Sequence, residues 1–249
     1  MTIRRQLLGS KARFSLVAIL LAITPVVAQL PDKFTNLQIL PKDISKNELQ
    51  ATMRGFAFAL NVRCPYCHVQ KADMTMDFPA DDKDQKKTAR IMLQMVAAIN
   101  HDYVSKIAKP SLVQVECATC HHGLTQPRLL NAVLAETIEK QGVDGATKQY
   151  HDLRRQYYGS GQYDFGEAPL NQLTESLLAK NKNKEAVAIM EMNFAVNNPT
   201  SVWSYHMLAM SHQANGEIEK AKADYSKVFE LHPDDSWAKQ QIDALSSHK

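Results

Sequence analysis

The chain contains the sequence Cys64-Pro65-Tyr66-Cys67-His68, and the same pattern returns as Cys117-Ala118-Thr119-Cys120-His121. In a Cys-x-x-Cys-His string, the two thiols form thioether bonds to porphyrin vinyl groups and the adjacent imidazole binds the iron. The two copies use all 4 cysteines of the chain. We therefore predict two covalently attached haem c groups, with thioether bonds from Cys64, Cys67, Cys117 and Cys120 and iron ligands from His68 and His121.

Paired cysteines have two other common uses, a zinc site and disulfide bonds. Repeated Cys-x-x-Cys pairs can hold a zinc ion, but zinc does not require a histidine directly after each pair. Disulfides suit an exported chain, but a chain of 249 residues can bury enough surface without them. The histidine that follows both pairs therefore favours haem.

The N-terminal residues predict export. An apolar run over 14–27 ends next to Ala28 and follows four basic residues, Arg4, Arg5, Lys11 and Arg13. We predict a signal peptide over residues 1–28, cleaved after Ala28, and a periplasmic or exported protein. The alternative is an uncleaved membrane anchor, which needs about 20 apolar residues, and this run is shorter. No later segment is apolar enough to span a bilayer.

The charge of the chain depends on this segment. The formal net charge is +3, and residues 1–28 hold four basic residues and no acidic one, so their removal changes it to −1. A weakly acidic mature protein argues against nucleic acid as a partner. Redox proteins are the partners that a haem protein of this kind predicts.

The composition divides the mature chain near residue 126, because both haem motifs lie before that point. We predict a dihaem domain over 29–126 and a helical domain over 127–249. The first contains a helix that begins with a capping box at 45–48 and a second helix over about 86–107, with a loop over 69–80. The charged front of the second helix, over 81–87, is predicted to be solvated.

The second half has the spacing of tetratricopeptide repeats, in which two antiparallel helices cross at small residues. One repeat is indicated by Tyr205, Leu208, Ala209, Gly216, Ala221, Tyr225 and Pro233, and a looser one by Leu173, Ala186, Met190 and Pro199. Helices over 131–140 and 144–158 precede these repeats, and a capping helix over 235–245 follows them. The predicted fold class is therefore all-α, a dihaem c-type cytochrome domain followed by a tetratricopeptide-like repeat domain.

The sixth ligand of each iron decides the function. Methionine gives an iron suited to electron transfer, whereas an empty position allows peroxide or small-gas chemistry. Met53 lies on the apolar face of the helix that leads into the first motif, where it is either a ligand or part of the core.

The order of elements over about 36–127 resembles the cytochrome c subunit of bacterial photosynthetic reaction centres. The resemblance rests on the runs 40–45 and 62–68, on Met92-Leu93-Gln94-Met95 followed by Ile99-Asn100, and on 117–123. In that family, three haems take a methionine from the helix preceding the motif, which implies Met53 for the first haem and Met95 for the second. Met92 stays open as the alternative to Met95. The family carries four haems and this chain has two motifs, so the chain resembles half of that subunit, and the repeats are foreign to it.

These observations predict an exported carrier of single electrons between periplasmic or membrane-associated redox partners, and not an enzyme. One partner is a membrane complex to which the repeats dock the cytochrome. Two alternatives stay open. One is a dihaem peroxidase-like enzyme, which needs a displaceable sixth ligand and a nearby acid. The other is a haem-bearing scaffold that binds a partner through its repeats.

Overall fold

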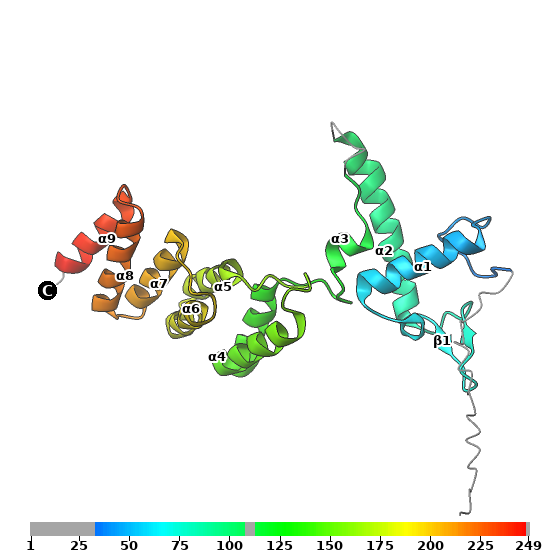
Figure 1. Cartoon of the computed structure of the whole chain (residues 1–249), viewed down its shortest axis with the longest axis horizontal. Coiled ribbons are helices and arrows are strands. Elements are labelled where there is room, and N and C mark those ends of the chain that lie inside the picture. The colour runs from blue at the N-terminus through cyan, green and yellow to red at the C-terminus, as the bar shows by residue number, and fades with distance from the viewer. Residues whose placement is uncertain (1–32, 108–112, 248–249) are drawn as a thin grey trace, which may run out of the picture.

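The computed structural model describes residues 33–107 and 113–247, so the predicted signal peptide lies outside the described residues. Within them the fold is almost wholly helical, as the sequence predicts, with one small pair of strands (Figure 1). The elements before residue 126 are α1 (Lys46–Leu60), η1 (Cys64–Tyr66), β1 (Val69–Gln70), β2 (Met76–Asp77), α2 (Asp84–Ala98), η2 (Ile99–Tyr103), η3 (Val104–Lys106) and α3 (Cys117–His121). Those after it are α4 (Leu130–Tyr157), α5 (Glu167–Ala179), α6 (Asn183–Asn197), α7 (Val202–Ala214), α8 (Ile218–Leu231) and α9 (Ser236–Ser247).

Helix α1 begins and ends at the residues that its sequence dictates. The predicted capping box is confirmed: the Ser45 hydroxyl accepts from the Glu48 amide at 3.2 Å, and the Glu48 carboxylate accepts from the Ser45 amide at 3.1 Å. Asn61 ends the helix in the left-handed conformation, with a φ of 53°. The chain then turns directly into the first motif, so α1 and Cys64 are held close together.

The second motif forms the short helix α3, which packs against α1. His122 and Gly123 end α3 with φ values of 47° and 83°, which turn the chain sharply. The Gly123 amide then donates to the carbonyl of Ala59 at 2.9 Å. This bond ties the end of the second motif to the last turn of α1, just before the first motif.

The helix predicted over 86–107 differs in form. The α-helical part, α2, runs over Asp84–Ala98 and continues as the π-helical turn η2 and the 3₁₀ turn η3. The Asn100 side chain accepts from the Val115 amide at 2.9 Å and donates to its carbonyl at 2.8 Å. The π-helical turn η2 thus carries Asn100, whose side chain binds the backbone of the segment that leads into the second motif.

The segment predicted as a loop over 69–80 contains the antiparallel pair β1–β2, in which Val69 faces Asp77 and Gln70 faces Met76. Strands of two residues are too short to show alternation in a sequence. The hairpin brings Phe78 back beside His68, and their rings meet edge to face at 5.1 Å.

Helices α4 to α9 form consecutive antiparallel pairs (Figure 1). The two helices predicted over 131–140 and 144–158 are the two arms of α4, which breaks at Gly142 with φ 72° and ψ −176°. That conformation is almost exclusive to glycine. Helix α5 packs on α6, α7 on α8, and α9 covers α8 in the position of the predicted capping helix. No described helix has the length and apolar character needed to cross a bilayer.

The repeat helices bury one apolar cluster on each side of a polar contact. The first cluster is centred on α4, α5 and α6, and the second on α7, α8 and α9. Between them Asn171 donates to the Ser204 hydroxyl at 2.8 Å and accepts from Asn193 at 2.9 Å, with all three side chains fully buried. Because each buried polar group has a partner, this contact fixes the register of α5, α6 and α7.

Candidate haem sites

A cavity of about 600 Å³ lies beside the first motif. It is enclosed by α1, by residues 33–40, by the start of α2 and by Cys64, Cys67 and His68, and the second motif contributes Cys117 and His121. This volume falls within the range of about 300–1,000 Å³ that small-molecule and cofactor sites occupy. Its wall includes the apolar side chains Leu49, Phe56, Leu60 and Leu93.

The imidazole of His68 is held by a backbone carbonyl. Its Nδ1 lies 3.1 Å from the carbonyl oxygen of Phe78, and since a carbonyl only accepts, Nδ1 carries the proton. The lone pair is therefore on Nε2, the atom free to bind a metal. Burial lowers the pKa of His68, and the nearby cations Lys86 and Arg90 lower it further. His68 is thus kept neutral, as an iron ligand must be.

His121 has the same arrangement with a different carbonyl. Its Nδ1 lies 2.7 Å from the carbonyl oxygen of Leu124, three residues further along the chain. The side chain is buried. Both motif histidines therefore present Nε2 as the free nitrogen, and metal-bound imidazoles commonly donate their other N–H to a backbone carbonyl in this way.

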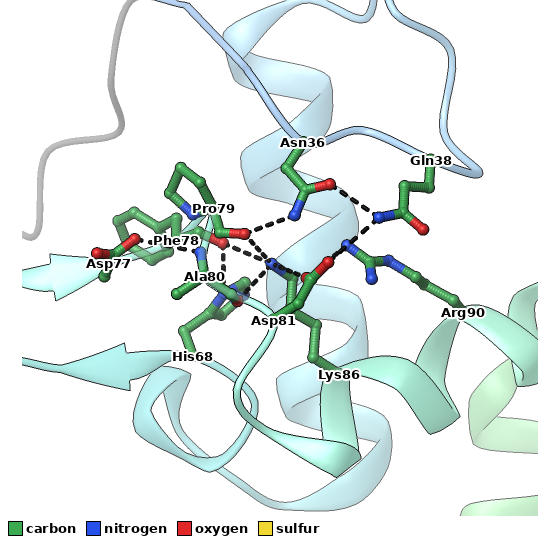
Figure 2. Close-up of polar contacts among 10 residues, drawn as sticks. All are labelled: Asn36, Gln38, His68, Asp77, Phe78, Pro79, Ala80, Asp81, Lys86 and Arg90. Atoms are coloured by element: carbon green, nitrogen blue, oxygen red, sulfur yellow. Dashed lines mark hydrogen bonds and ion pairs between the residues drawn. The ribbon is translucent and has the colours of Figure 1, made fainter.

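A polar cluster surrounds the carbonyl that holds His68 (Figure 2). Lys86 Nζ donates to the carbonyls of Phe78, Pro79 and Ala80 at 2.8, 2.9 and 2.8 Å, and lies 2.9 Å from the Asp81 carboxylate. Arg90 donates to the same carboxylate at 2.8 Å and lowers the pKa of Asp81, with help from Lys86. The front of α2, predicted to be solvated, is therefore partly folded inward, because the Lys86 side chain is only 11% exposed.

The four thiols are unpaired and either exposed or half-buried. Burial raises the pKa of the Cys67 and Cys117 thiols. In the described ranges, His, Cys, Asp and Glu side chains form no group of three or more that could hold a metal ion. The two cysteine pairs are therefore not gathered into one zinc-type site, and each pair stays beside its own histidine.

A family comparison agrees with this geometry. The family model described as "Photosynthetic reaction centre cytochrome C subunit" matches residues 21–212 of the chain. The chain belongs to that family. The match runs beyond residue 127, where the resemblance read from the sequence ends, and takes in α4 to α6 and most of α7. The expectation that the repeats are foreign to this family is therefore wrong for that stretch. Membership in the reaction-centre cytochrome family implies covalently bound haem c.

Two curated relatives match a shorter part of the chain. The photosynthetic reaction center cytochrome c subunit of Thermochromatium tepidum is 32% identical over 97 residues, which cover 38% of this chain and 22% of that protein. Cytochrome c-554 of Chloroflexus aurantiacus is 36% identical over 97 residues, which cover 39% of this chain and 22% of that protein. The chain thus matches under a quarter of the length of either cytochrome.

One solved structure resembles the chain weakly. The NMR structure of the first TPR domain of the human RPAP3 protein aligns with a TM-score of 0.33 and 19% identity, covering 47% of this chain and 87% of that one. A similarity of this size adds nothing to the description of the helices given above.

The methionines of this reaction-centre-type cytochrome are placed differently from one another. Met53 lines the cavity beside the first motif, as does Met92. Met95, the predicted ligand of the second haem, is not part of the cavity wall and is 42% exposed. Met74 is 71% exposed at the hairpin turn. Two thioethers therefore lie in the cavity wall, that of Met53 from α1 and that of Met92 from α2.

The residues of this cytochrome fit haem c. Each motif places two thiols beside a histidine whose Nε2 is free, and the cavity beside them has apolar walls and the volume of a cofactor site. The sequence does not predict the groups that hold the two histidines, namely the carbonyls of Phe78 and Leu124 and the Lys86 side chain. The carbonyls carry no sequence signal, since every residue has one, and the position of Lys86 depends on the hairpin that folds back over it.

Proposed function

We propose that this protein is an exported dihaem c-type cytochrome that passes single electrons between periplasmic or membrane-associated redox partners. The observation that carries the proposal is the shared arrangement of His68 and His121, each with Nδ1 bonded to a backbone carbonyl and Nε2 free. One such histidine beside paired thiols supports one haem. Two support a dihaem protein.

In this proposal the residues bind and shield the cofactor and carry out no bond chemistry. Haem supplies a one-electron couple at iron when it is bound. Cys64, Cys67, Cys117 and Cys120 would hold the two groups through thioether bonds, His68 and His121 would bind the irons, and Met53 would supply a thioether at the first site. The mostly apolar wall of the cavity would surround the bound group with few competing polar ligands, which favours a fixed ligand set.

For the second site, the ligand implied by resemblance is Met95, and it stays a prediction. The placement of Met92 in the cavity wall, which also contains Cys117 and His121, favours the alternative. The two residues lie one turn apart on α2, about 60° from one another around the helix axis. We therefore propose that α2 supplies the thioether and that Met92 is the better placed of the two.

The wall of the cavity supports a carrier over a peroxidase-like enzyme. Among the described residues, Asp84 is the sole carboxylate of that wall, and it lies 2.9 Å from Lys87 in an ion pair. A peroxidase needs an acid that exchanges a proton beside the iron. A carrier needs none.

We further propose that the haem-binding part ends near residue 126 and that residues 127–249 form a repeat domain that docks the cytochrome to a redox partner. Its support is the packing of α4 to α9 on one another in antiparallel pairs. We propose cleavage after Ala28 as the route to the mature exported protein.

A potentiometric titration of the purified holoprotein, followed by absorption spectra, tests the proposed function. We expect two one-electron waves, low-spin spectra and the weak sulfur-to-iron band of methionine ligation. A content of one haem per chain, or a stable high-spin iron in the oxidised protein, would contradict the dihaem carrier, and the high-spin result would favour the peroxidase-like alternative.

A further inference from the structure

The two haem motifs differ in what lies behind their histidines. The Phe78 carbonyl accepts from His68 at 3.1 Å and also from Lys86 Nζ at 2.8 Å. The Leu124 carbonyl accepts from His121 at 2.7 Å. In the part of the chain that the structure describes, no lysine or arginine donates to Leu124. One histidine thus shares its carbonyl with a cation, and the other does not.

The cation at the first site is built into the fold. Lys86 uses its three donors on the carbonyls of Phe78, Pro79 and Ala80 and contacts Asp81, and its side chain is 11% exposed (Figure 2). Fixed donors at this burial are screened far less by salt than surface charges are.

The neighbouring charges do not cancel that of Lys86. Asp81 is shared with Arg90, whose side chain is 16% exposed, so these three groups keep one net positive charge. Asp77, whose pKa is lowered chiefly by the Ala80 amide and to a smaller extent by Lys86, pairs with Lys71 at 3.3 Å. The positive charge therefore stays beside the imidazole of His68.

We propose that Lys86 is a positioning residue that raises the reduction potential of the first haem and leaves that of the second unchanged. The inference rests on the proposed function, since it requires a haem at each motif. It assigns the difference between two sites that share the same ligand types to a lysine that contacts the carbonyl behind one of the histidines.

Two physical effects act in the same direction. Oxidation adds a positive charge at the iron, and a nearby fixed cation makes that charge less favourable. Lys86 also draws electron density from the Phe78 carbonyl, which weakens its bond to His68 Nδ1–H and makes the imidazole a poorer donor to ferric iron. Each effect favours the reduced state of the first haem.

The test compares Lys86→Met with Lys87→Met in the full-length holoprotein by potentiometric titration. Methionine keeps the length and apolar stem of lysine and removes the charge. Lys87 is a matched control, because it is the next residue of α2 and its side chain is 54% exposed and pairs with Asp84. A variant with Cys117→Ser and Cys120→Ser retains one haem and assigns the wave of the first site.

We expect Lys86→Met to shift the reduction equilibrium of the first haem about tenfold toward the oxidised state. For one electron, this lowers the potential by about 59 mV. The second wave and both waves of Lys87→Met should stay in place. Lys86→Arg, which restores the charge, should recover most of the shift. An unchanged or raised first wave, or an equal shift of both waves, would overturn the inference.

A variant that fails to bind the first haem also tests the inference. If Lys86→Met does not bind that haem, the potential of the first haem is measured in Lys86→Gln, which keeps an N–H donor without the charge, and the same downward shift is expected. If both neutral variants fail to bind that haem while Lys86→Arg binds it, Lys86 serves assembly only and the inference is wrong. Failure of the proposed function looks different, because the wild-type protein would then lack two waves.

Discussion

A methionine in the wall of a haem-sized cavity is either an iron ligand or a packing residue, and a substitution of Met53 distinguishes the two roles. If it is the ligand, Met53→Ala removes the sulfur-to-iron band of one haem and lowers its potential by roughly 0.1–0.3 V, part of the ~0.8 V range that axial ligands cover. Spectra and a redox titration measure both. Met74→Ala, at a side chain that is 71% exposed, is the control and should change neither. Two unchanged haems in Met53→Ala would make Met53 a packing residue.

The second site depends on a choice between two residues of α2. We expect Met92→Ala to remove the sulfur band of the second haem and Met95→Ala to keep it, because Met92 lies in the cavity wall and Met95 is 42% exposed. Absorption and magnetic circular dichroism spectra of the two variants distinguish them. Loss of the band in Met95→Ala alone would restore the ligand that the family resemblance implies.

For single residues of the haem sites, the sequence predicts those that thioether attachment requires and few others. The thiols and His68 are readable because thioether attachment fixes their spacing. Met92 and Met95 share one helical stripe, so periodicity cannot choose between them. The position of Lys86 cannot be predicted from the sequence, because a lysine in a charged run is usually solvated. Its burial depends on backbone carbonyls that come together only when the hairpin folds.

Among the helices, α9 depends on a single carboxylate at its start. Asp235 Oδ1 accepts from the Ala238 amide at 2.9 Å, and Oδ2 lies 2.8 Å from His206 Nε2. The bond from the Ala238 amide, with help from His206, lowers the pKa of Asp235. Asp235→Ala should destabilise the repeats by about 1 kcal/mol at neutral pH, the usual cost of an N-cap. Urea unfolding followed by tryptophan fluorescence measures it, since Trp203 and Trp237 both lie in repeat helices.

The sign of the pH effect follows from the lowered pKa of Asp235. Its contribution is fully present above the ordinary aspartate pKa of about 3.9 and is lost as the pH falls through the lower folded-state value. Asp235→Asn keeps a capping oxygen, so we expect near-normal stability at neutral pH and a smaller loss on acidification. Asp234→Ala, at the exposed neighbour, should behave as the wild type. An equal acid response in Asp235→Asn would contradict this assignment.

Elements with strong local signals are the ones that the sequence predicts well. The capping box of α1, the two arms of α4 and the capping helix all appear where the pattern indicates them. The hairpin β1–β2 does not, because its strands have two residues each, too few to show an alternating pattern. The π-helical turn η2 is equally hidden, since its Asn100 side chain bonds to the backbone of Val115, 15 residues further along the chain.

For the whole molecule, the division near residue 126 predicts two unfolding events. Both apolar clusters consist of residues after 126, and the described helices before residue 126 pack mainly on one another. We expect haem absorbance and tryptophan fluorescence to give different urea midpoints, since the two probes lie in different parts. Coincident transitions with both probes would show one cooperative unit and would contradict the proposed division.

The two parts of the molecule also differ in what stabilises their folds. The repeats are held by apolar clusters and the buried Asn171–Asn193–Ser204 contact, whereas the first part encloses a large cavity between two long helices. A part with such a cavity gains stability from whatever fills it. Covalent attachment at both motifs is therefore the claim on which the other proposals depend.

Intact and peptide mass spectrometry of the protein, produced with export and haem attachment, tests that claim most directly. We predict the polypeptide mass plus two haem groups, with one haem on the peptide containing Cys64 and Cys67 and the other on the peptide containing Cys117 and Cys120. The bare polypeptide mass, or a haem on one peptide only, would contradict the account.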